Sequence, residues 1–174
     1  DFDKALEMLK NVNQYQLSKE ENTQYIMKLG YAKFMTGDSQ GAIEALEEAY
    51  KTTEGSDKND IAYMLGHLYY ADGQNEKAFT FFDQIKENEK YARVVKPYYV
   101  QLYFNDKDYD KAIVEGNALL NENISADYKA EVHKMIGESY FMKGDYDSAY
   151  PHLKNYLESK TNPSESDLYE MGFV

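Results

Sequence analysis

The 174-residue sequence contains no cysteine, and only one of its 19 basic residues is an arginine, Arg93. The absence of cysteine excludes a disulfide scaffold, a thiolate zinc site and a thiol nucleophile. The 31 acidic residues give a formal net charge of −12. This charge argues against nucleic acid and anionic membrane surfaces as partners, because clusters of Lys and Arg hold phosphates. No apolar run approaches the ~20 residues needed to cross a bilayer, so we expect no direct membrane insertion.

The sequence also lacks the motifs of a metal site or an active site. The three histidines show no paired i, i+4 spacing and stand at His67, His133 and His152, so we do not expect them to bind a metal. The Asp-rich run at 105–112 lacks the glycine and the final glutamate of a calcium loop, and we interpret it as a helix cap. There is no phosphate-binding loop and no Ser/His/Asp set. We therefore predict a protein without enzymatic activity or cofactor.

Small residues recur along the whole chain at a nearly constant spacing. One alanine falls in the same register in five segments, at intervals of 37, 36, 34 and 37 residues: Ala5, Ala42, Ala78, Ala112 and Ala149. Twelve residues before the last four of these alanines stand Gly30, Gly66, Val100 and Gly137. Glycine within a helical pattern costs about 1 kcal/mol relative to alanine. We therefore expect these glycines, like the alanines, to mark places where two helices approach closely.

This pattern resembles the tetratricopeptide repeat, a helix–turn–helix unit of 34 residues with Leu-Gly on its first helix and Ala on its second. The resemblance implies an all-α fold, an αα-hairpin solenoid wound as a right-handed superhelix. We expect one array over 1–174 that is a fragment of a longer protein, because native solenoids end in polar caps. The predicted segments are a second helix plus loop at 1–22, repeats at 23–58, 59–92, 93–129 (degenerate) and 130–164, and the start of a further repeat at 165–174.

Several local features refine this prediction. Gly144 suits the left-handed conformation that ends a helix, and the Asp145 carboxylate suits the cap of the next one. The third repeat departs from the pattern, since Val100 replaces the expected glycine and Gly116 replaces a large apolar residue. Its first helix either starts near Pro97 or is kinked there. Pro151 similarly removes one hydrogen bond from the last predicted helix.

The resemblance implies a binding function that depends on the shape of the array. The first helices would line a concave groove that holds a peptide or helix of another protein. The candidate groove residues follow the spacing of one helical face: Met27, Tyr31, Phe34, Tyr63, His67, Tyr70, Gln101, Phe104, Lys134, Glu138 and Phe141. An aromatic side chain ends the series in each repeat, and two interpretations are open. These rings either form a ladder that contacts a ligand or pack against the next repeat.

Some members of the family bind the C-terminal carboxylate of chaperones through Lys, Asn and Arg. The corresponding positions here cannot form charged hydrogen bonds to a carboxylate, since they hold Met27, Tyr31, Met64, Val94 and Tyr98. We therefore expect an apolar groove and a protein or peptide partner. Two alternatives remain open, a sensor module that binds a small peptide or metabolite and, less favoured, carbohydrate binding. The Lys-rich, Arg-poor composition suggests a bacterial source, and the pattern leaves compartment and oligomeric state open.

Overall fold

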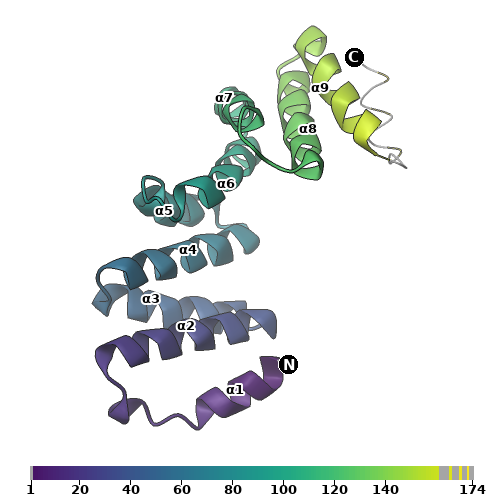
Figure 1. Cartoon of the computed structure of the whole chain (residues 1–174). Helices are drawn as coiled ribbons and strands as arrows, with labels where there is room; N and C mark the ends of the chain where they lie inside the picture. Colours follow the sequence, from purple (N-terminus) through teal and green to yellow (C-terminus); the bar gives the residue numbers. More distant parts are fainter. Residues whose placement is uncertain (1, 161–164, 166–168, 170–171, 173–174) are drawn as a thin grey trace. The chain divides into compact units, whose positions relative to one another are not determined.

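The computed structural model describes residues 2–160, 165, 169 and 172, and the regular structure in these residues is entirely helical (Figure 1). The chain divides into two compact units, residues 1–93 and residues 94–174, and each is described by itself. Among the described residues, no helix is both long enough and apolar enough to span a membrane. The predicted all-α fold of helix pairs is confirmed for this part of the chain.

The first unit is a succession of helices, with a longer segment that contains a 3-10 helix between the first two. Its elements are α1 (Phe2–Lys10), the 3-10 helix η1 (Gln14–Gln16), α2 (Lys19–Met35), α3 (Ser39–Thr52), α4 (Ser56–Ala71) and α5 (Asn75–Ile85). α2 packs along α3, and α4 packs along α5. α4 also contacts α3 and α2, and α1 contacts α2. The contact between α2 and α4 places two first helices of successive pairs side by side.

The second unit contains most of α6 (Ala92–Asn105), together with α7 (Tyr109–Leu120), α8 (Ala126–Met142) and α9 (Tyr146–Ser159). α8 packs along α9 and against α7. A cluster of buried apolar side chains joins α6, α7 and α8 and consists of Val100, Ile113, Leu119, Val132, Met135 and Ile136. The predicted start of a further repeat at 165–174 lies mostly outside the described residues, and the repeat boundaries remain predictions.

The helix ends follow the signals in the sequence. At the start of α2, Ser18 and Glu21 form a reciprocal capping box, in which each side chain accepts a hydrogen bond from the other residue's backbone N–H. Gly144 has φ +75°, and the Asp145 side chain accepts a hydrogen bond from the Ser148 N–H at 3.2 Å. The predicted turn between α8 and α9 is therefore confirmed. Lys107, with φ +62°, adopts the left-handed conformation at the equivalent turn before α7.

The glycines predicted at close helix contacts each face a large side chain sixteen residues later. A Cβ added at these glycines would lie within 3 Å of that neighbour, 2.8 Å for Gly30 and Leu46, 2.6 Å for Gly66 and Phe82, and 2.7 Å for Gly137 and Leu153. The four alanines of the second helices are fully buried at 0% exposure: Ala42, Ala78, Ala112 and Ala149. Small residues thus allow the paired helices to pack tightly, as the sequence predicts.

In the third repeat, the large residue lies on the first helix and the glycine on the second. Val100 lies on the first helix and Gly116 on the second, again sixteen residues apart. A Cβ at Gly116 would lie 3.6 Å from Val100 and 2.7 Å from Ile136 of α8. The close approach at Gly116 is therefore to Ile136 of α8, whereas the distance to Val100 is an ordinary packing distance. α6 begins at Ala92 and contains Pro97, so this helix passes through the proline rather than starting at it.

Candidate functional site

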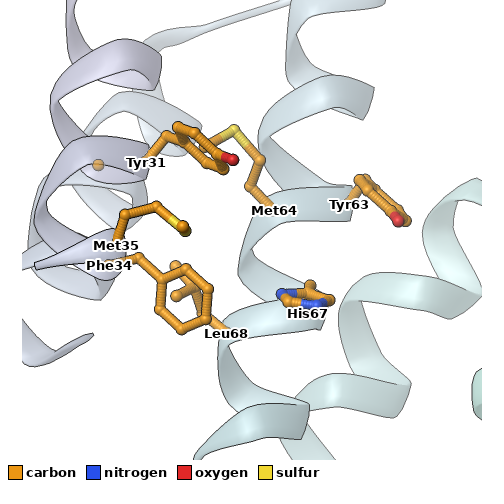
Figure 2. A pocket seen from close by; sticks show the side chains of 8 residues that line it. Tyr31, Phe34, Met35, Tyr63, Met64, His67 and Leu68 are labelled. Carbon is orange, nitrogen blue, oxygen red and sulfur yellow. The ribbon is translucent and has the colours of Figure 1, made fainter. Parts of the chain in front are cut away.

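An apolar cavity of about 350 Å³ lies between α2 and α4 in the first unit. α2 contributes Gly30, Tyr31, Phe34 and Met35, and α4 contributes Tyr63, Met64, His67 and Leu68. Figure 2 shows the aromatic and methionine side chains of the two helices gathered around this cavity. None of the lining residues carries a formal charge when His67 is neutral. The cavity therefore suits uncharged, apolar side chains.

Contacts outside the cavity hold its aromatic walls in place. The Tyr31 ring is 51% exposed and meets the Phe2 ring of α1 edge-on, with centroids 5.7 Å apart. The Tyr63 ring stacks on Tyr91 at 5.2 Å, and the Tyr91 hydroxyl donates to the Asp60 carboxylate. Such offset and edge-on ring pairs are favourable arrangements. The walls are therefore partly preorganised, while Tyr31 keeps about half of its surface free for a partner.

The Phe34 and His67 rings form the contact between the two helices at the cavity. Their centroids lie 5.7 Å apart and their planes are nearly perpendicular. Burial lowers the pKa of His67 below its usual value, because a partly desolvated imidazolium is less stable than a neutral imidazole. His67 is therefore neutral at pH 7, and the cavity keeps its apolar character at that pH.

The pKa of His67 predicts a dependence of stability on acid pH. Its folded-state pKa lies below the unfolded value, so the stabilisation is complete above the unfolded pKa of about 6.5 and is lost as the pH falls through the folded pKa. We expect the His67 ring resonances to titrate below pH 6.5 in an NMR titration. We also expect His67→Gln to lose less stability than the wild type between pH 7.5 and pH 5. Equal losses in the two proteins would contradict this role.

The structure brings four of the predicted groove residues together around the cavity, namely Tyr31, Phe34, Tyr63 and His67. Met27 and Tyr70 are half-buried on the same two helices but are not among the residues lining it. Gly30, Met35, Met64 and Leu68 line it and were not among the predicted site residues. These four residues lie next to the predicted groove positions on α2 and α4, on the sides of the two helices that line the cavity. A search for apolar residues adjoining the predicted face would have found them.

The predicted residues of the second unit have partners within the chain. Gln101 donates to the Asn105 side chain at 2.9 Å. Lys134 and Glu138 form an ion pair at 3.6 Å, and the Lys134 ammonium also lies 5.0 Å from the centre of the Tyr156 ring. These contacts stabilise α6 and the α8–α9 pair.

The two predicted ladder aromatics of this unit share one packing arrangement. Phe104 meets Tyr109 edge-on at 5.9 Å, and Phe141 meets Tyr146 at 5.3 Å. In both cases the partner is the first residue of the following helix. These two rings therefore pack on the second helix of their own predicted repeat, whereas the packing alternative placed them against the next repeat. Their role in a ligand-binding ladder stays a prediction.

Two of the three histidines, predicted to be separate polar positions, are in contact. His133 lies on α8 and His152 on α9, and their Nδ1 atoms are 3.0 Å apart. The nineteen-residue separation gave no sign of this, because it depends on how α8 and α9 are rotated about their axes. Among the described residues, no group of three or more His, Cys, Asp and Glu side chains is arranged to hold a metal ion.

Comparisons with known proteins show what parts of this chain are similar to. The sequence profile of the family described as "Tetratricopeptide repeat" matches residues 60–89, which contain α4 and α5. The chain carries a tetratricopeptide repeat. Over its whole length it is 27% identical to the TPR repeat-containing protein MJ1428 of Methanocaldococcus jannaschii. The match covers 100% of this chain and 30% of that protein, so the chain spans less than a third of the relative's length.

Solved structures of MamA share the fold of this chain. A structure of MamA from MSR-1 superposes with a TM-score of 0.74 at 23% identity, covering 90% of this chain and 86% of the other. A structure of MamA from AMB-1 gives a TM-score of 0.75 at 21% identity, with 91% and 89% covered. The resemblance to the family that the sequence indicates is confirmed at residues 60–89, and the similarity to the MamA structures shows the fold of most of the chain.

Proposed function

We propose that this tetratricopeptide repeat chain is a protein-interaction scaffold whose cavity between α2 and α4 receives apolar side chains of a partner polypeptide. The observation that carries the proposal is the cavity itself, about 350 Å³ in volume and lined by aromatic and methionine side chains without a formal charge. Ligand sites range over roughly 300–1,000 Å³. This cavity lies at the lower end of that range, which suits a few anchoring side chains better than a large ligand.

The chemistry of the walls favours one kind of partner. Met35 is 45% exposed and Met64 lies across the cavity from it (Figure 2). Methionine adapts its shape to different apolar groups, and aromatic rings supply rigid contact area. An amphipathic helix presents apolar residues at i and i+4 to such a groove. With the chain at net charge −12, a partner whose polar face carries Lys and Arg would associate faster at low salt.

Carbohydrate binding and nucleic-acid binding receive less support from the same site. A sugar site needs several convergent polar groups, and the polar groups on this cavity's side chains are the hydroxyls of Tyr31 and Tyr63 and the ring nitrogens of His67. A nucleic acid would meet a strongly acidic chain. The sensor alternative uses the same groove with a smaller ligand.

The proposal is tested by NMR of protein labelled at the methionine methyl groups. We expect a synthetic amphipathic peptide, with Leu at i and i+4 and Lys on its polar face, to shift the methyl signals of Met35 and Met64. Met142 is 58% exposed on α8 and serves as an internal control that should not shift. The double variant Tyr31→Ala, Met64→Ala should weaken binding by at least about tenfold, because truncating anchors in a desolvated pocket removes most of the affinity.

A matched control and a second peptide make the result decisive. Tyr150 is 44% exposed on α9, so Tyr150→Ala removes a comparable exposed ring elsewhere and should leave peptide affinity unchanged. A peptide of the same composition with its apolar positions scrambled should bind weakly. Equal shifts at Met142 and Met64, or unchanged affinity in the folded double variant, would show that the cavity is not the binding site.

A further inference from the structure

Two histidines of the second unit form a pair across neighbouring helices. His133 of α8 and His152 of α9 have ring centroids 5.1 Å apart and Nδ1 atoms 3.0 Å apart. Both rings are half-buried. α8 and α9 pack along each other, and this packing positions both rings. The pair is therefore a preformed arrangement of two imidazole nitrogens.

The surroundings of the pair keep both rings neutral. Burial lowers the pKa of both histidines, the Lys129 ammonium one turn earlier on α8 lowers that of His133 further, and His133 lowers that of His152. The Tyr140 ring, also on α8, lies 6.0 Å from the His152 ring and is uncharged at pH 7. Neutral imidazole is the form that binds transition metals. At pH 7 the pair thus presents one Nδ1 lone pair directly, and the other Nδ1 becomes a ligand when its proton moves to Nε2 of the same ring.

The distance between the two Nδ1 atoms favours metal ions with a particular coordination geometry. An ion about 2.1 Å from each nitrogen, a usual imidazole–metal distance, would subtend an angle of roughly 90° at the 3.0 Å separation. This is the angle between neighbouring ligands of square-planar or octahedral ions, whereas a tetrahedral ion would need a separation of ~3.4 Å. Divalent copper prefers tetragonal geometry and binds nitrogen ligands more tightly than the other divalent first-row metals.

We propose that His133 and His152 form a binding site for divalent copper that joins α8 to α9. Because no third His, Cys, Asp or Glu accompanies the pair in the described part of the chain, water completes the coordination. In the free pair one ring carries its proton on Nδ1 and donates it to the other ring. Binding moves that proton to Nε2 of the same ring, and the aqua ion loses two waters. No electron is transferred and no net proton is released at neutral pH.

The net charge of −12 favours a cation, and the nearby Lys129 ammonium opposes it. A ligand that binds the folded state raises its stability, and an ion held by both helices would resist their separation. We therefore expect copper to raise the thermal midpoint of the wild type measurably. The same addition should leave the midpoint of a variant lacking either histidine unchanged.

The site is tested by titrating the chain with Cu(II), using calorimetry and electron paramagnetic resonance, with glycine present to compete for free copper. We expect one ion per chain, nitrogen hyperfine coupling from two imidazoles, and at least tenfold weaker binding in His133→Asn and in His152→Asn. His67 of α4 provides the matched control, since it is also half-buried. His67→Asn should bind copper as the wild type does.

A measurement on the unaltered protein covers the case in which a variant does not fold. Substoichiometric Cu(II) should broaden the ring signals of His133 and His152 in the NMR spectrum before those of His67. Uniform broadening of all three, or copper affinity that is the same in the wild type and in the folded single variants, would overturn the proposal. In that event the contact is a hydrogen bond between neutral rings that serves helix packing alone.

Discussion

Replacing Phe82 with alanine is expected to lower the free energy of unfolding by about 3–5 kcal/mol, the usual cost of removing a fully buried phenylalanine ring. Phe82 lies on α5 at 0% exposure and fills the space that Gly66 of α4 leaves open. Removing the ring leaves a cavity between two helices that cannot close further, because their backbones already approach closely at the glycine. Urea unfolding followed by circular dichroism measures the loss.

The same pair offers a test of the size relationship itself. Gly66→Leu should cost about 1–3 kcal/mol by overpacking, since even its Cβ would lie 2.6 Å from the Phe82 ring. In the Phe82→Ala background the new leucine has room, so the two changes should compensate in a double-mutant cycle. Thr80→Ala on the exposed face of α5 should change stability by less than about 0.5 kcal/mol. Additive losses in the cycle would show that residues 66 and 82 are not in contact.

The sequence predicted the fold because the packing of helix pairs depends on residue size at fixed intervals. Ala78 and Ala149 are fully buried, and Gly66 and Gly137 face large side chains, as their recurrence indicates. Helix ends could be predicted for a similar reason: the Asp145 cap depends on residues only three positions apart. Such features need no knowledge of how one helix pair is placed on the next.

The site could be predicted only in part, because it depends on how neighbouring helices are rotated and offset. Tyr31 and His67 were found from the face that the repeat defines, whereas Met35 and Met64 line the cavity from the flanks of that face. The contact between His133 and His152 depends on the rotation of two helices about their axes, which periodicity does not determine. Side-chain partners such as Tyr109 for Phe104 likewise depend on the turn between two helices.

Replacing Gly116 with leucine is expected to destabilise the second unit by about 1–3 kcal/mol or more, because the side chain would enter space that is already filled. A Cβ at this position would lie 2.7 Å from Ile136 and 3.6 Å from Val100, and both of these residues are fully buried. In the other repeats the equivalent second-helix position holds a large apolar residue, such as Leu153 opposite Gly137. A sequence that looks closer to the family pattern should therefore be less stable here.

The double variant Gly116→Leu, Val100→Gly has a glycine on the first helix and a large residue on the second, as in the other repeats. It tests whether Val100 or Ile136 is the reason for the glycine at position 116. If Val100 alone required the glycine, the double variant would regain the stability lost in Gly116→Leu. We expect it to remain destabilised, since Ile136 of α8 occupies the nearer space and is unchanged. Adding Ile136→Ala to Gly116→Leu should instead give a loss smaller than the sum of the two single losses. Ala118→Leu, on the exposed face of α7, controls for the added side chain and should leave the urea midpoint unchanged.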